Sequence, residues 1–180
     1  NPANRRMSSF LLGCGLPGGM MGSMMADLTG VMGAINNNRK AKGEAELSED
    51  ELLVKLFNEV AYVWPRVGYP PLVTPFSQYV KNIALMNLLT ESMGKPRYSM
   101  MDNSIWGMIL GKSGRLPGEV APEIKELAKE KGFEFTDADP QSYYPDDLDR
   151  FIKEMEENGW DRGEDDEELF DFAMHKTQYR

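Results

Sequence analysis

Apolar residues recur at helical spacing in each long segment of this chain, and this periodicity most constrains the fold. The clearest case begins after Leu47, where Ser48 and Glu51 have the spacing of a capping box at a helix start. The apolar residues that follow share one helix face: Leu52, Leu56, Phe57, Val60 and Trp64. Pro65 then closes the segment, which is predicted to be an amphipathic helix.

A second helix is predicted in the segment LPGGMMGSMMADLTGVMGAI. Its apolar residues also follow helical spacing: Met21, Met24, Met25, Leu28, Met32 and Ile35. Glycine and other small residues fill the remaining positions, so this helix is intrinsically weak and needs close packing against a neighbour. Methionine clusters fill irregular cores more often than they bind cofactors. The polar stretch INNNRKAKGEAE that follows is predicted to be a mobile loop.

Further helices are predicted along the rest of the chain. They run from Pro75 to about Leu89, over Ser104–Leu110, over Pro122–Lys131, around Leu148–Met155 and around Leu169–Ala173. Gly132 and Gly159 end two of them. The stretch FEFTDADPQSYYP is irregular, with room for one short strand. The sequence therefore predicts a mainly α protein.

Charge divides the chain near residue 119. Residues 1–118 hold 12 Lys and Arg against 9 Asp and Glu, whereas residues 119–180 hold 8 against 20. An acidic region of this size repels phosphate backbones and argues against nucleic-acid binding, and its ordinary role is a solvated helical surface. We interpret residues 1–14 as the edge of a preceding region and residues 15–180 as one helical domain, with an acidic tail from about residue 119.

Several classes of site are missing from the sequence. No stretch approaches the ~20 apolar residues that a membrane helix needs. Cys14 is the only cysteine, which excludes a disulfide within the chain and favours a cytoplasmic location. His175 has no cysteine or histidine partner at metal-ligand spacing, so no metal site is predicted. Neither a glycine-rich phosphate loop nor a nucleophile elbow is present.

The stretch GYPPLVTPFSQ, residues 68–78, gathers polar groups at a helix start. Threonine before proline is pushed into extended geometry, and proline is favoured at the first helical position. Thr74 is therefore predicted to be an N-cap, with Pro75, Phe76 and Ser77 as the first turn and the Gln78 amide at the same helix terminus. Such a helix terminus attracts anions and stabilises developing negative charge. The residues alone nevertheless favour a purely structural cap, because threonine caps are common.

Three stretches, in order, resemble the biotin-dependent carboxyltransferases: LPGGMMGSM, GYPPLVTPFSQYVKNIALMNLL and RYSMMDNSIWGMILGKSGRLPGEVAPEI. This family includes the carboxyltransferase region of pyruvate carboxylase, the oxaloacetate decarboxylase α subunit and the transcarboxylase keto-acid subunit. The resemblance covers residues 15–125 well and the acidic tail only loosely. PPLVTPxSQ is its specific part. Gly22 and Ser23 depart from the Thr-Asn that many members have at this point.

The resemblance implies a helical funnel-type domain over the mouth of a metal-bearing (β/α)8 barrel of the same enzyme. It assigns to Thr74 a proton relay between biotin and pyruvate, and to Ser77 and Gln78 contacts with the biotin ureido ring. The implied cofactor is biotin on a carrier protein or domain, and the divalent metal belongs to the barrel. Such a barrel needs ~250 residues, so this chain of 180 residues is expected to be the part without it, inactive by itself.

The alternative is a non-enzymatic helical interaction or dimerisation module with Thr74 as a simple cap. Carboxylation of pyruvate, decarboxylation of oxaloacetate and action on another 2-oxo acid all stay open. Because the methionine-rich helix would normally meet a barrel, Met20–Met25 are expected to be exposed here and to be buried by self-association. The acidic helices are expected to lie away from Thr74, since like charge there would oppose the entry of an anionic substrate.

Overall fold

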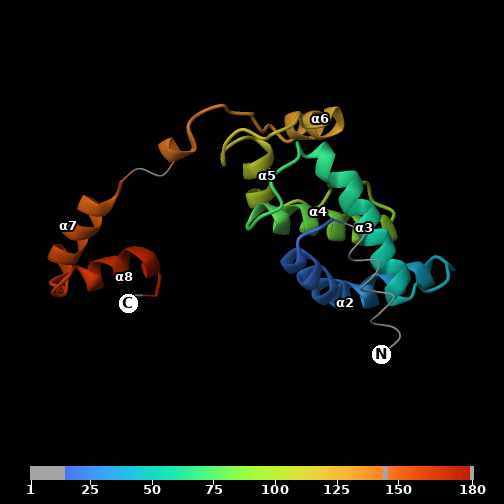
Figure 1. Ribbon diagram of the computed structural model, residues 1–180, viewed down its shortest axis with the longest axis horizontal. Helices are drawn as coiled ribbons and strands as arrows, with labels where there is room; N and C mark the ends of the chain where they lie inside the picture. The colour runs from blue at the N-terminus through green and yellow to red at the C-terminus, as the bar shows by residue number, and fades with distance from the viewer. Residues whose placement is uncertain (1–14, 144–145, 179–180) are drawn as a thin grey trace. The chain divides into compact units, whose positions relative to one another are not determined.

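The computed structural model describes residues 15–143 and 146–178, and this part of the chain is helical (Figure 1). It holds seven α-helices and one short 3-10 helix, Pro140–Tyr143. Within the described residues the only β pairing is an isolated antiparallel bridge between Val67 and Val120, so the short strand expected after Gly132 is not formed there. The mainly α prediction is confirmed. The segment 1–14, with Cys14, lies outside the described residues.

The chain divides after Ala138 into two compact units, each with its own core. In the first unit, α2 packs against α3 and α4, and α3 packs along α4 (Figure 1). The unit contains α2 (Gly18–Ala41), α3 (Glu49–Arg66), α4 (Phe76–Ser92), α5 (Asn103–Ile109) and α6 (Pro122–Glu130). The apolar residues of each helix meet in one core because their spacing keeps them on one face.

The methionine-rich helix α2 is a core element. Met20 and Met24 are 2% and 0% exposed, and Met21 and Met25 pack against the same core. The expectation that Met20–Met25 form an exposed apolar surface is therefore wrong, because α3 and α4 of the same chain already bury two of these side chains. The glycines of α2 do not mediate this packing, because a Cβ added at Gly22, Gly30 or Gly33 would meet no atom within 4 Å.

Helix α2 also extends further than the sequence indicates. It continues to Ala41, so the first half of the expected loop at residues 35–46 is helical. Asn36 exchanges two hydrogen bonds of 2.9 Å with the backbone of Leu47, and Asn38 Nδ2 donates to Ser92 Oγ at 3.0 Å. These tertiary bonds hold a polar segment that has little helix propensity of its own.

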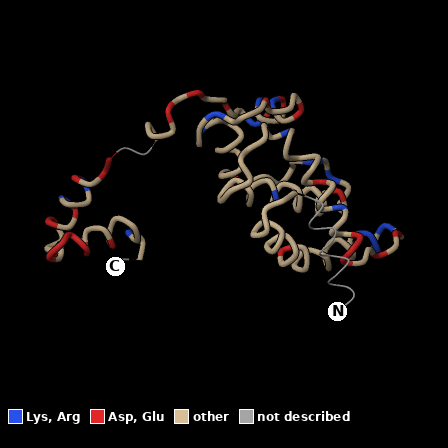
Figure 2. Tube along the Cα trace, viewed as in Figure 1, with Lys and Arg blue, Asp and Glu red and all other residues tan. Residues whose placement is uncertain are grey.

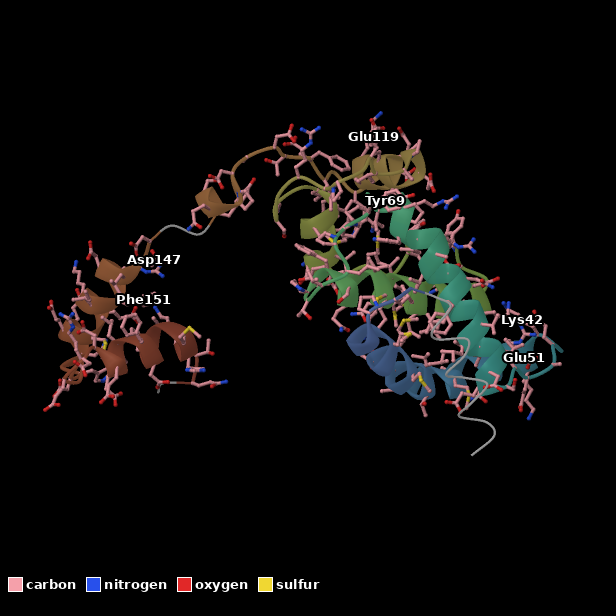
Figure 3. The ribbon with its side chains drawn as sticks, viewed as in Figure 1. Lys42, Glu51, Tyr69, Glu119, Asp147 and Phe151 are labelled. Carbon is pink, nitrogen blue, oxygen red and sulfur yellow. The ribbon has the colours of Figure 1, made fainter. Side chains whose placement is uncertain are left out.

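The start of α3 forms as predicted. The Ser48 side chain accepts the Glu51 N–H at 3.3 Å, and the Glu51 carboxylate accepts the Ser48 N–H at 2.8 Å. This capping box satisfies two backbone donors that the helix leaves open. It belongs to the end of the first unit where Figure 3 labels Glu51 and Lys42.

The second unit is a helical pair, α7 (Leu148–Asn158) and α8 (Glu167–His175). Its core consists of Met155, Leu169 and Phe172, and Phe151 and Trp160 set their rings edge-on to Phe172 at centroid distances of 5.6 and 5.3 Å. Residues 139–180 hold 14 Asp and Glu against 5 Lys and Arg, and Figure 2 shows acidic positions along both helices. In the first unit, residues 1–138, 15 Asp and Glu are balanced by 15 Lys and Arg.

Candidate functional site

The segment between α3 and α4 is held against the end of α3. Trp64 Nε1 donates to the carbonyl oxygen of Pro70 at 2.8 Å, and the rings of Trp64 and Tyr69 meet edge-on at 5.4 Å. Tyr69 lies at the same end of the first unit as Glu119 (Figure 3). The indole of α3 therefore sets the path of the chain into the PPLVTPFSQ stretch.

A glycine pair secures the other side of this segment. The Gly118 N–H donates to the Gly68 carbonyl at 2.9 Å. Gly68 has a φ of 85°, and a Cβ there would lie 2.8 Å from the Gly118 carbonyl oxygen. Only glycine combines this left-handed backbone with so close an approach. The GYPPLVTP and GRLPGEV stretches thus meet at a backbone contact that tolerates no side chain.

Thr74 does not cap α4. Pro75 occupies the N-cap position with φ −88° and ψ −11°, and no side chain caps the helix. The Ser77 N–H instead donates to the Val73 carbonyl at 2.9 Å, and the Gln78 N–H donates to the Pro75 carbonyl at 3.0 Å. The predicted threonine cap is therefore wrong. These two N–H groups also cannot bind an anion, because backbone carbonyls already occupy them.

The three side chains predicted for the site differ in exposure. Thr74 is exposed, Ser77 is 4% exposed and Gln78 is half-buried. The Thr74 hydroxyl makes no hydrogen bond to any other residue that the structure describes. The Thr74–Pro75 peptide bond is cis. Thr74 thus presents a hydroxyl that has no structural partner among the described residues, directly before a helix whose first turn carries Ser77 and Gln78.

Polar pairs join α2 to α4 and bring the PGGM stretch to the PPLVTP stretch. Ser23 Oγ on α2 donates to Gln78 Oε1 on α4 at 3.3 Å. One turn further along, Lys81 Nζ donates to Asp27 Oδ2. The two pairs have sequence separations of 55 and 54, so the two helices run in the same direction at these contacts. We call these four residues the α2–α4 seam.

Sequence reasoning missed Asp27 and Lys81 and noted Ser23 only as a departure from the family pattern. Lys81 is 5% exposed, which is unusual for a lysine unless it is paired. The sequence did hold one signal for Lys81, since it is a lysine on the apolar face of the helix predicted from Pro75 to about Leu89. Its partner could not be found from local spacing, because Asp27 lies 54 residues away.

The polar groups at the site suit a neutral ligand with hydrogen-bonding groups. The hydroxyls of Thr74 and Ser77 and the amide of Gln78 carry no charge, and the charges of the seam, Lys81 and Asp27, compensate each other. The ureido ring of biotin, the ligand that the resemblance implies, is neutral and offers one carbonyl acceptor with N–H donors, so hydroxyl and amide groups of this kind match it chemically.

The described residues contain no metal-binding cluster and no membrane helix. No three His, Cys, Asp or Glu side chains among them are placed to hold a metal ion. No helix in this part of the chain combines the length and the apolar character needed to cross a membrane. The candidate site therefore consists of the PGGM and PPLVTPFSQ stretches, which meet where Ser23 contacts Gln78.

Comparisons with known proteins agree with the resemblance. Residues 33–180 match the family model described as "Conserved carboxylase domain". A pyruvate carboxylase subunit of Methanocaldococcus jannaschii is 28% identical over 175 residues, which is 97% of this chain and 27% of that protein. The 2-oxoglutarate carboxylase large subunit of Hydrogenobacter thermophilus is 30% identical over 91% of this chain and 22% of its own length.

A third relative comes from a transferase. The methylmalonyl-CoA carboxyltransferase 5S subunit of Propionibacterium freudenreichii subsp. shermanii is 34% identical over 116 residues, or 64% of this chain and 19% of that protein. The chain thus spans about a quarter of the length of the curated relatives it matches. Since the family model covers most of the chain, the chain belongs to the biotin-dependent carboxyltransferase family, in which it corresponds to the conserved carboxylase domain.

Proposed function

We propose that this chain is the helical funnel part of a biotin-dependent carboxyltransferase that moves a carboxyl group between carboxybiotin and a 2-oxo acid, pyruvate or oxaloacetate. The observation that carries the proposal is the contact between Ser23 and Gln78. It joins the PGGM stretch to the PPLVTPxSQ stretch, two of the segments on which the resemblance rests, at the helix that begins next to Thr74.

Thr74 is the proposed proton relay. A threonine hydroxyl is too weak an acid or base to act alone, but it can accept a proton on Oγ1 from one reactant while it donates its own to the other. This requires both partners within about 3 Å of the oxygen. The exposure of Thr74 and the lack of a hydrogen bond to the described residues support the role, since no contact among them competes for the hydroxyl.

Ser77 and Gln78 are the residues proposed to bind the ureido ring of biotin. When bound through its carrier, biotin supplies the carboxyl group that is transferred. The amide of Gln78 and the hydroxyl of Ser77 would orient the ring by hydrogen bonds, and orientation of this kind contributes to the rate by holding reactants in place. The metal that such enzymes use would come from the barrel, which the described residues do not form.

The names of the relatives support the substrate class. One is named for pyruvate carboxylase and another for 2-oxoglutarate carboxylase, and both names specify a 2-oxo acid. The alternative is an interaction module in which Thr74 serves only as a helix cap. It does not explain Thr74, because no side chain caps α4.

Substitution of Thr74 in the intact enzyme tests the proposal. Thr74→Ala should lower carboxyl transfer between biotin and the 2-oxo acid by about 100-fold or more. Thr74→Ser should retain most of the activity, and Thr74→Val should behave like Thr74→Ala. Carboxylation of biotin at its separate site should not change. Since Thr74 caps no helix, the melting temperature should also stay the same in all three variants. Wild-type transfer by Thr74→Ala would refute the relay.

A further inference from the structure

The amide of Gln78 has two chemically different ends, and the structure engages only one of them. Its oxygen Oε1 accepts the hydrogen bond from Ser23 Oγ at 3.3 Å. Its nitrogen Nε2 makes no hydrogen bond to any other described residue. The single hydroxyl proton of Ser23 is shared between Gln78 Oε1 and the Met20 carbonyl of its own helix, 3.1 Å from Oγ, and both contacts hold the side chain at the start of α2.

A second pair of the α2–α4 seam secures the same helix face. Gln78 and Lys81 lie three residues apart on α4, so they point to the same side of the helix. Lys81 is ion-paired with Asp27, four residues after Ser23 on α2, and its side chain is 6% exposed. This pair fixes the register of the two helices at the level of Gln78, and Asp27 compensates the positive charge of Lys81 beside the amide.

We propose that Ser23 is a positioning residue that selects the donor end of the Gln78 amide for the ligand. By occupying Oε1, it leaves Nε2 to donate to a carbonyl acceptor, which in this site is the ureido oxygen of biotin. Without Ser23 the Gln78 amide can rotate by half a turn about its Cγ–Cδ bond. Its oxygen would then face the ureido oxygen, and two acceptors cannot form a hydrogen bond. This inference rests on the proposed function, because the ligand it names is the one proposed above.

A double-mutant cycle in the intact enzyme tests the inference. Ser23→Ala should raise the KM for the biotinylated carrier about five-fold, the value of one ordinary hydrogen bond, and leave kcat within about two-fold. In the Gln78→Ala background, Ser23→Ala should have no further effect, since the amide it positions is gone. Ser23→Thr keeps the hydroxyl and should restore the wild-type KM.

Thr29 provides the matched control. Its hydroxyl lies on the same helix, donates to the Met25 carbonyl at 3.1 Å and reaches no other helix among the described residues. Thr29→Ala should therefore leave the KM unchanged. The positioning role is overturned if Thr29→Ala raises the KM as much as Ser23→Ala does. It is also overturned if Ser23→Ala raises the KM by the same factor with and without Gln78.

The same cycle separates this inference from the proposed function. If Gln78→Ala leaves the KM for the carrier unchanged, the proposed contact of Gln78 with biotin fails, and the role of Ser23 fails with it. If Gln78→Ala raises the KM and Ser23→Ala does not, the contact with biotin stands and only the positioning role is overturned.

A measurement on this chain without biotin provides a second test. The side-chain NH2 group of Gln78 can be followed by nitrogen-15 relaxation. Ser23→Ala should lower the order parameter of this group, whereas Thr29→Ala should not change it. An order parameter that is equal in wild type and Ser23→Ala would show that Ser23 does not restrain the amide, and would overturn the inference without reference to activity.

Discussion

The guanidinium of Arg97 binds the buried carboxylate of Glu59 through two hydrogen bonds, 2.8 Å from Nε to Oε1 and 3.1 Å from Nη2 to Oε2. Asn87 Nδ2 on α4 donates to the same carboxylate at 2.9 Å, and Asn87 Oδ1 accepts the Tyr98 N–H at 2.8 Å. The bond to Glu59 raises the pKa of Arg97, and burial raises the pKa of Tyr98. These residues join α3, α4 and the turn after α4.

Loss of Arg97 should be costly because Glu59 would stay buried without a cation. The Glu59 side chain is 6% exposed, whereas that of Arg97 is 45% exposed. Arg97→Met is therefore expected to lower the free energy of unfolding by about 2 kcal/mol, below the range for fully buried pairs because water reaches the guanidinium. Denaturant titration of the first unit measures this change.

Two further variants test the reason for this cost. Glu59→Gln combined with Arg97→Met removes the buried charge and should recover part of the loss. Lys40→Met breaks an exposed pair with Glu46, at side-chain exposures of 75% and 60%, and should change stability by less than about 0.5 kcal/mol. Equal effects of Arg97→Met and Lys40→Met would contradict the importance of the buried carboxylate.

The capping box of α3 should make stability depend on pH through Glu51. The hydrogen bonds from Ser48 favour the ionised carboxylate and hold the pKa of Glu51 below its usual value of 4.5. A depressed pKa contributes stability above the unfolded value, and this contribution is lost as the pH falls through the folded pKa. The difference in unfolding free energy between wild type and Glu51→Gln should therefore shrink between about pH 6 and about pH 3.

Glu49 serves as the control for the pH experiment. It lies in the same first turn of α3 but outside the capping box. The corresponding difference for Glu49→Gln should vary less over the same pH range. If both variants follow the same pH course, the general field of the helix start, and not the bonds from Ser48, determines the effect.

The second unit should unfold on its own when its small core is damaged. Phe172 is 2% exposed and contacts Phe151 and Trp160, whereas Phe170 on the same helix is 58% exposed. Phe172→Ala should cost about 3 kcal/mol or more, which is a large share of the stability of a unit of this size. Phe170→Ala should stay within about 0.5 kcal/mol of wild type.

Backbone amide spectra distinguish the two units in this experiment. In Phe172→Ala the signals of residues 146–178 should move to unfolded positions, while those of α2, α3 and α4 should not change. Simultaneous loss of the α3 signals would contradict separate cores. Removal of the chain after Ala138 should likewise leave the melting temperature of the first unit unchanged.

The sequence by itself determined the elements whose interactions lie within a few residues. The capping box joins Ser48 to Glu51, three residues apart, and the end of α7 needs only Gly159, which adopts a φ of 69°. Amphipathic spacing likewise predicted the buried face of α3. Such features form wherever the local residues occur, so the mainly α class followed from local rules.

Only the tertiary structure decided the extent of α2, the environment of Thr74 and the contact of Ser23 with Gln78. The extension of α2 depends on Asn36 and Leu47, 11 residues apart, and Gln78 meets Ser23 from 55 residues away. The Thr-Pro step predicts a cap by local geometry, yet Pro75 takes the cap position and Thr74 stays exposed without a partner among the described residues. Contacts between helices of distant sequence decide these points, and no local spacing encodes which side chains will meet.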